Sequence, residues 1–347
     1  MMRLPGFRYR APRTIDDATA WLAEDSANTM LVAGGTDLLP NMKRRQQTPA
    51  TLIGLRGIKE FAEIHNGSAL SVGAGVTLSS LVGDPRIRQQ FTGLWQAAAQ
   101  VATPHLRNMG TIGGNLCLDT RCTYYDQNFE WRKSIDFCMK KDGQTCWVAT
   151  SSPKCLAVSS TDTAPMLQAL GATVTLRSAA GERVLPLADF FANDGMHYLT
   201  KRQDEILASV TLPDVEGWRS SYWKLRRRGA FDFPVAAAAV AARLEGTNVV
   251  DIRIVLGAVA SRPLEADRAA ALLRGQTLSD ELIAEAAALA SEIAKPMDNT
   301  DFELVWRKKM VRSLVVDALR EVRGDDMRAR RRQLARQELL STLSVTG

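Results

Sequence analysis

Four cysteines within one short stretch of the chain have side chains that could bind metal. Gaps of 15, 7 and 8 residues separate Cys122, Cys138, Cys146 and Cys155. Four thiolates on one loop can saturate either a tetrahedral zinc ion or a [4Fe–4S] cube. The gaps match neither the C-x2-C pairs common in zinc sites nor the bacterial ferredoxin pattern, so spacing leaves both metals open. We expect the fifth cysteine, Cys117, to be a small buried thiol and a substitute ligand if one of the four fails.

Two glycine-rich segments, residues 32–37 (VAGGTD) and 107–115 (RNMGTIGGN), could hold phosphate groups. Glycine lets the main chain approach a ligand closely, and successive N–H groups in such turns form a concave anion site. Thr36, Thr111 and Asn115 add hydrogen-bonding side chains. Neither segment has the G-x-G-x-x-G or G-x-x-x-x-G-K-[ST] pattern, so the standard dinucleotide and P-loop mechanisms are not supported. Together the two turns predict a pyrophosphate site.

Local patterns place these segments in a mixed α and β region. Residues 15–27 are predicted to form a helix capped by Thr14, and residues 30–33 a short strand that runs into the first glycine segment. Further strands are expected at 51–55 and 69–76, and helices at 78–82 and 89–102. Residues 117–158 hold all five cysteines and show little periodicity, so we interpret them as an irregular insertion.

The remaining sequence predicts a second α+β unit. A helix at 164–170 and strands at 173–177, 181–184 and 205–212 precede a turn-like segment near residue 215. Strands at 220–226, 236–244 and 249–259 and helices at 266–273, 280–294 and 301–322 follow it. We therefore divide the chain into residues 1–215 with the insertion at 117–158, residues 216–325, and a basic C-terminal helix or tail at 326–347.

Composition narrows the functional classes. The 347 residues are 46% hydrophobic and 24% charged, with a net charge of +6. This excess is too small to indicate nucleic-acid binding, and part of it lies in one C-terminal cluster, for which a solvated helix face is expected. The start of the chain has no signal peptide and no stretch is long enough to span a membrane, which predicts a cytoplasmic protein. An odd number of cysteines fits a disulfide framework poorly. The C-terminal cluster of positive charge mentioned above consists of Arg328, Arg330, Arg331, Arg332 and Arg336.

The two glycine segments resemble the FAD-binding signatures of the flavoprotein subunits in the xanthine dehydrogenase and carbon monoxide dehydrogenase family. Residues 31–37 are similar to the A-G-G-T-x-L turn of that family and residues 102–115 to its R-N-x-G-T-[IL]-G-G-N turn. Residues 160–165, 204–207, 222–226 and 306–319 resemble further family segments, so the likeness spans nearly the whole chain.

This resemblance implies an α+β protein with an FAD-binding fold of the vanillyl-alcohol-oxidase type, made of two α/β subdomains and followed by a C-terminal α+β lobe. It implies that the pyrophosphate lies between the glycine turns, that Asp162 contacts the ribityl or ring region, and that Lys224 reaches the isoalloxazine. A cation there would favour the anionic reduced flavin. The implied FAD-binding residues are Leu31, Val32, Ala33, Gly34, Gly35, Thr36, Asp37, Val101, Thr111, Gly113, Gly114, Asn115, Asp162 and Lys224.

The position of the cysteine loop, directly after a proposed flavin-binding turn, favours an iron–sulfur cluster over structural zinc. Such a loop resembles that of the β subunit of 4-hydroxybenzoyl-CoA reductase, with the ligands at Cys122, Cys138, Cys146 and Cys155. The resemblance implies a large molybdenum-cofactor subunit and a small subunit with two [2Fe–2S] clusters, assembled as a dimer of heterotrimers. It further implies ferredoxin as electron donor, reductive dehydroxylation of 4-hydroxybenzoyl-CoA to benzoyl-CoA, and an anaerobic role in aromatic degradation.

Two alternatives stay open. One is a flavoprotein subunit of an aldehyde or carbon monoxide dehydrogenase type of hydroxylase that passes electrons to NAD or a quinone. The other is a zinc-stapled binding module. No catalytic residue is predicted in this chain, because His65, His105 and His197 are isolated from any nucleophile or metal motif. His105 lies within residues 102–115, which resemble the second FAD-binding signature, and is kept as a candidate for contact with the cofactor.

Overall fold

The N-terminal part of the chain forms a three-stranded parallel sheet. The computed structural model describes residues 3–67 and 69–334. The sheet has the order β1-β3-β2, from β1 (Arg8–Arg10), β2 (Thr29–Val32) and β3 (Thr51–Gly54). Helix α1 (Ile15–Glu24) begins where predicted, because the Thr14 side chain accepts a hydrogen bond from the Asp17 amide at 3.1 Å. It ends three residues earlier than predicted.

A five-stranded antiparallel sheet lies beside it. Its order is β4-β5-β8-β6-β7, and its strands are β4 (Ile64–Asn66), β5 (Leu70–Gly73), β6 (Thr173–Ser178), β7 (Gly181–Pro186) and β8 (Ile206–Leu212). Helices α3 (Leu78–Gly83), α5 (Thr92–Ala99) and α9 (Thr163–Ala169) bury their apolar residues in the same core as this sheet. Pairing of β5 with β8 joins segments that are far apart in the sequence.

The prediction of one helix at 89–102 is wrong. The segment contains the end of α4 (Pro85–Gln90) and the separate helix α5, with a break at Phe91. Phe91 has φ −122° and ψ 51°, outside the helical region, and its side chain is buried in the core. Burial of this ring therefore takes precedence over helical continuity.

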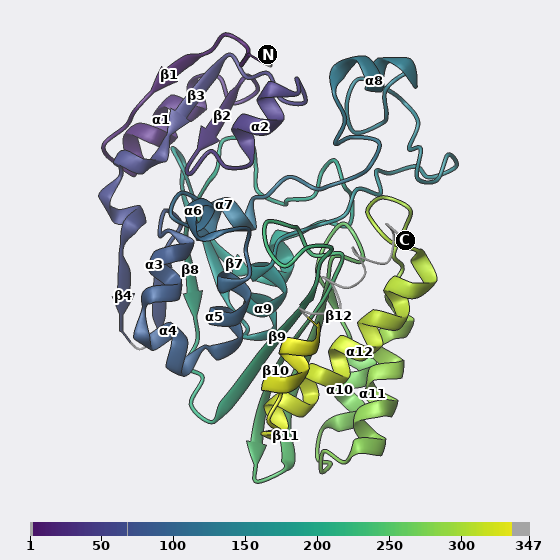
Figure 1. The fold of residues 1–347 in the computed structure, drawn as a ribbon. Coiled ribbons are helices and arrows are strands. Elements are labelled where there is room, and N and C mark those ends of the chain that lie inside the picture. The colour runs from purple at the N-terminus through teal and green to yellow at the C-terminus, as the bar shows by residue number, and fades with distance from the viewer. Residues whose placement is uncertain (1–2, 68, 335–347) are drawn as a thin grey trace.

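The C-terminal unit is an antiparallel sheet covered by helices. The order is β12-β11-β10-β9, from β9 (Trp218–Leu225), β10 (Ala236–Glu245), β11 (Asn248–Gly257) and β12 (Leu264–Glu265). Helices α10 (Asp267–Leu273), α11 (Asp280–Glu292) and α12 (Leu304–Arg323) share one core with this sheet, and Figure 1 shows them alongside it. The alanines of β10 are buried on both faces, which lets α12 pack closely on one face and α9 on the other.

The cysteine-rich stretch 117–158 is irregular as predicted, apart from the short helix α8 (Phe129–Ser134). Figure 1 shows α8 at the outer end of this stretch, where its buried Arg132 donates to the Arg45 carbonyl at 3.4 Å. Several short elements had no clear sequence signal, because fewer than two turns or four residues give no usable periodicity. Besides β1, β4 and β12, these are α2 (Leu38–Lys43), α6 (Pro104–Arg107), α7 (Ile112–Leu116) and the 3-10 turns Leu55–Gly57, Lys59–Ala62 and Leu187–Phe190.

The basic C-terminal segment folds back onto the last sheet and helix as far as the structure describes it. Residues 328–334 are helical, and residues 335–347 of the predicted helix or tail lie outside the described residues. Arg330 pairs with Asp317 at 3.0 Å and Arg331 with Glu321 at 2.5 Å. Part of the predicted solvated cluster is therefore engaged in packing. Within the described ranges, none of the helices combines the length and apolar character needed to cross a bilayer.

Candidate functional site

A large cavity of about 630 Å³ lies where the two N-terminal sheets and the C-terminal unit meet. Its size is within the usual range for small-molecule sites. Both glycine segments line it, and so do Val101 and Asp162. All the residues predicted to bind FAD line this one cavity, with the exception of Lys224. The tertiary structure therefore brings together segments that the sequence separates by more than a hundred residues.

The first glycine turn, after β2, offers free backbone donors. The amides of residues 34–37 donate no hydrogen bond to any residue that the structure describes. Gly35 has φ +71°, in the left-handed region that favours glycine. A Cβ atom on Gly34 would overlap the carbonyl oxygen of Met109, so this turn packs directly against the second segment. Unpaired amides at the wall of a cavity are the feature expected of an anion site.

The second glycine turn is arranged differently, because most of its amides already donate hydrogen bonds to nearby protein groups. Thr111 caps α7 by accepting a hydrogen bond from the Gly114 amide at 3.0 Å. The Gly113 amide donates to the Ala74 carbonyl at 2.9 Å. Asn115 Oδ1 accepts from the hydroxyls of Thr161 and Thr163 at 2.8 and 2.7 Å. This turn therefore serves mainly as a scaffold that fixes the 161–163 segment at the cavity.

Asp162 reaches the cavity from that segment and is buried. The Tyr222 hydroxyl donates to Asp162 Oδ1 at 2.8 Å, and Lys224 Nζ donates to Oδ2 at 3.0 Å. Burial raises the pKa of Asp162 and lowers the pKa of Lys224, while the hydrogen bonds between them oppose both shifts. The attraction between the two groups thus offsets part of the cost of burying them.

Lys224 lies behind the cavity wall, and its reach to the isoalloxazine stays a prediction. Its side chain is fully buried and lies outside the cavity lining. Besides Asp162, its ammonium donates to the carbonyl oxygens of Gln100 at 3.0 Å and Asp232 at 2.9 Å. All three protons are engaged, so Lys224 acts on the cavity through Asp162 and through the backbone that it holds.

Sequence reasoning missed part of the cavity wall. The loop between β9 and β10 contributes Phe231 and Phe233, and Phe231 has a positive φ of +75°. Arg121 and Asp119 also line the cavity, and Arg121 pairs with Asp37 of the first turn. These residues lie on irregular segments, where a single sequence gives no periodic signal. The exposed His105 does not line the cavity.

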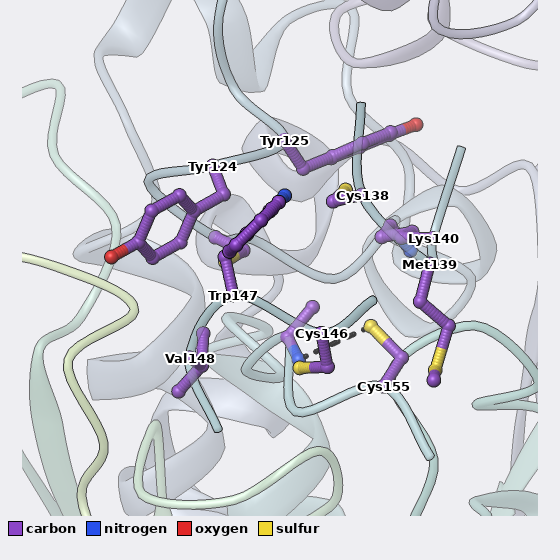
Figure 2. Close-up of a pocket in the computed structure, with 11 residues that line it drawn as sticks. Tyr124, Tyr125, Cys138, Met139, Lys140, Cys146, Trp147, Val148 and Cys155 are labelled. Atoms are coloured by element: carbon purple, nitrogen blue, oxygen red, sulfur yellow. Dashed lines mark hydrogen bonds between the residues drawn. The ribbon is translucent and has the colours of Figure 1, made fainter. Parts of the chain in front are cut away.

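The four predicted metal ligands line a second, small cavity. Cys122, Cys138, Cys146 and Cys155 are each about 5% exposed and come from separate parts of the loop. Figure 2 shows Cys138, Cys146 and Cys155 around this pocket with Met139 and Lys140. Cys117 is not among them, since it lines the large cavity instead. The fold thus separates Cys117 from the group of four.

Burial makes two of the four thiols hard to ionise. Burial raises the pKa of Cys122 to about 12 and that of Cys155 to about 11. A bound metal would be needed to deprotonate them near neutral pH. In the described part of the chain, no three His, Cys, Asp or Glu side chains are placed to hold a metal ion. The cysteines surround a shared cavity, but they do not converge on one point.

The cavity and fold together define an FAD-binding protein. Residues 5–215 match the family described as "FAD binding domain in molybdopterin dehydrogenase", and residues 220–322 match "CO dehydrogenase flavoprotein C-terminal domain". The chain therefore belongs to the family of FAD-binding subunits, or medium chains, of molybdenum hydroxylases of the xanthine and carbon monoxide dehydrogenase type. It is an oxidoreductase subunit with a mixed α/β fold.

Individual relatives agree with this placement. The chain is 31% identical to the aldehyde oxidoreductase FAD-binding subunit PaoB of Escherichia coli, over 91% of this chain and 99% of that subunit. It is 29% identical to the carbon monoxide dehydrogenase medium chain of Afipia carboxidovorans, over 88% and 93%. A chain in the structure of carbon monoxide dehydrogenase from Hydrogenophaga pseudoflava superimposes with a TM-score of 0.75 at 28% identity, covering 92% of this chain and 98% of that one.

Proposed function

We propose that this chain is the FAD- and [4Fe–4S]-carrying electron-transfer subunit of a molybdenum-containing 4-hydroxybenzoyl-CoA reductase. The observation that carries the proposal is the set of four buried cysteines around the small cavity, which we call the cysteine cavity. Residues that flank the cysteine loop line the large cavity, which we call the flavin cavity. Family membership establishes the FAD-binding role. The cluster, the substrate and the donor rest on the cysteine loop and its resemblance.

The residues of the large cavity suit an FAD molecule in defined ways. When bound, FAD supplies the exchange between two-electron and one-electron chemistry. The unpaired amides of residues 34–37 would bind the pyrophosphate, and Asp162, held by Lys224, would accept hydrogen bonds from the ribityl or ring region. Phe231 and Phe233 would cover apolar surface at the rim. We also propose the vanillyl-alcohol-oxidase type of flavin fold for residues 1–215.

The four cysteines suit a cluster better than a single ion. In a [4Fe–4S] cube each thiolate binds a different iron atom, so the sulfurs need only surround a common space. A zinc ion would require all four within about 2.3 Å of one point, and the described residues show no such convergence. A zinc-stapled binding module also does not agree with membership in this flavoprotein family.

The proposal places this chain within a larger assembly. We infer a large subunit that holds the molybdenum cofactor and the substrate, a small subunit with two [2Fe–2S] clusters, and a dimer of such heterotrimers. Ferredoxin would supply electrons of low potential. In this scheme the present chain has no substrate site, and its residues serve to bind and position redox groups.

A second candidate is the flavoprotein subunit of an aldehyde or carbon monoxide dehydrogenase type of hydroxylase. The relatives named above favour it, because they are subunits of a carbon monoxide dehydrogenase and an aldehyde oxidoreductase. The two candidates differ in the direction of electron flow. One takes electrons from a low-potential donor to remove the ring hydroxyl of 4-hydroxybenzoyl-CoA as water, and the other oxidises its substrate and passes electrons outward. Assays of the purified complex with 4-hydroxybenzoyl-CoA and with aldehydes would separate them.

The cluster is tested by metal analysis of the complex purified without oxygen. We expect about four iron atoms for this chain, in a [4Fe–4S] cube, beyond those of its partners. The double variant Cys138→Ala, Cys146→Ala should lose them while it keeps FAD. The matched control Cys117→Ala should keep both, since Cys117 is outside the cysteine cavity. Full iron in the double variant, or zinc in the wild type, would reject the ligand assignment.

A further inference from the structure

The flavin cavity and the cysteine cavity are connected by one buried ion pair. Asp119 lines the flavin cavity and Lys140 lines the cysteine cavity. Lys140 Nζ lies 2.8 Å from Asp119 Oδ1, and the side chains are 6% and 5% exposed. A buried pair of this kind is held firmly, because separating its charges inside the protein is costly.

Every proton of the Lys140 ammonium has an acceptor. Besides Asp119, it donates to Thr120 Oγ1 at 2.7 Å and to the Gly195 carbonyl at 2.6 Å. The Gly195 amide in turn donates to the Cys155 carbonyl at 2.9 Å. Lys140 thus ties the loop between two of the cysteines to the backbone beside a third and to the flavin cavity.

Lys140 is also the charged side chain of the cysteine cavity. Among the described residues that line this cavity, the others are cysteines, aromatic residues and small or apolar residues. The rings of Tyr125 and Tyr198 lie 4.9 and 5.3 Å from its Nζ atom, and the Tyr125 hydroxyl donates to Asp119 Oδ2 at 2.9 Å. The pair is therefore oriented, with its positive end at the cysteines and its negative end at the flavin cavity.

We propose that Lys140 is a positioning residue that sets the reduction potential of the redox centre at the four cysteines, with Asp119 fixing its orientation. This inference rests on the proposed function. A cluster held by four thiolates becomes more negative on reduction, and a nearby cation in a medium of low polarity stabilises that reduced state. The Lys140 ammonium therefore raises the potential of the centre, and the Asp119 carboxylate lowers it.

The test is a redox titration of the cluster in the intact complex, followed by electron paramagnetic resonance. In Lys140→Met the potential should fall, so that the ratio of reduced to oxidised cluster at a fixed setting drops about tenfold, equal to about 59 mV for one electron. In Asp119→Asn it should rise. Lys140→Arg, which keeps the charge, should stay near the wild type. A merely structural role would not give shifts of opposite sign.

The control is Lys141→Met, which removes the same charge from the adjacent residue. Lys141 pairs with Asp142, is 32% exposed and does not line the cavity. The Lys141→Met variant should leave the reduction potential of the cluster unchanged. Equal potentials in Lys140→Met, Asp119→Asn and the wild type, all with full iron, would overturn the inference and leave the proposed function intact.

Two other outcomes are also decisive. If Lys140→Met fails to assemble the cluster, the reduction potential of the cluster in Asp119→Asn becomes the test. A potential equal to or below that of the wild type would contradict the electrostatic role. If the wild-type complex contains no iron in this chain, the proposed function fails, and the role of Lys140 fails with it.

Discussion

Lys224 Nζ lies 3.0 Å from Asp162 Oδ2, and this ion pair is buried at the junction of the C-terminal sheet with the flavin cavity. Asp162 precedes α9 of the N-terminal part, while Lys224 belongs to β9. The pair therefore joins the two matched family segments at the cofactor site. Any change to either partner should affect both stability and FAD retention.

Replacing Lys224 by methionine should destabilise the chain by about 3–5 kcal/mol, because it removes the ammonium that pairs with a buried carboxylate. Chemical denaturation monitored by circular dichroism measures this, and the ratio of FAD to protein after gel filtration should fall. The control Lys309→Met changes an exposed lysine of α12 and should cost less than about 0.5 kcal/mol. Equal stability of the two variants would contradict the assigned role.

Replacing Gly34 by alanine should separate the two glycine turns, since the new methyl group overlaps the Met109 carbonyl. We expect a loss of roughly 1–3 kcal/mol in stability and a clear loss of bound FAD. In Gly83→Ala the added Cβ atom meets no neighbour within 4 Å, so that variant should retain FAD. Fluorescence titration with FAD compares the two, and normal binding by Gly34→Ala would refute the close approach.

Removing the Asn115 side chain should loosen the segment that carries Asp162. In Asn115→Ala the buried Thr161 and Thr163 hydroxyls lose their acceptor, which costs about 1–3 kcal/mol for each group left unpaired. Ser79→Ala breaks an exposed hydrogen bond to Asn108 and should have a much smaller effect. Urea midpoints of the two variants provide the measurement, and similar midpoints would show that Asn115 is dispensable.

Glu205 should contribute a stability that depends on pH. Its hydrogen bond with Arg183 lowers the pKa of the Glu205 carboxyl below the usual 4.5. A carboxyl with a lowered pKa in the folded state stabilises the protein above pH 4.5, and this contribution is lost as pH falls through the folded value. Glu205→Gln should therefore be less stable at pH 7 and show a flatter decline below pH 5. Parallel declines in thermal stability for both proteins would contradict the prediction.

Local signals in the sequence predicted the helices and strands whose stabilising contacts are made between near neighbours in the chain. The Thr14 cap, the strand before Gly34 and the alanine-rich strand at 236–244 were all predictable, because capping, glycine turns and apolar runs act between near neighbours. The glycine and cysteine patterns picked out residues that the fold gathers: all predicted flavin residues except Lys224 line one cavity, and the four cysteines line another. Contact of the flavin residues with FAD stays a prediction.

Tertiary structure decided which side chains meet. The place of Lys224 behind Asp162, the separation of Cys117 from the other cysteines, and the Lys140–Asp119 pair depend on contacts between segments with no local signal. The break at Phe91 had the same cause, since burial in a core assembled from distant strands outweighed helix continuity. Sequence by itself thus fixed the chemical groups available, whereas packing of distant segments selected which of them face a cofactor.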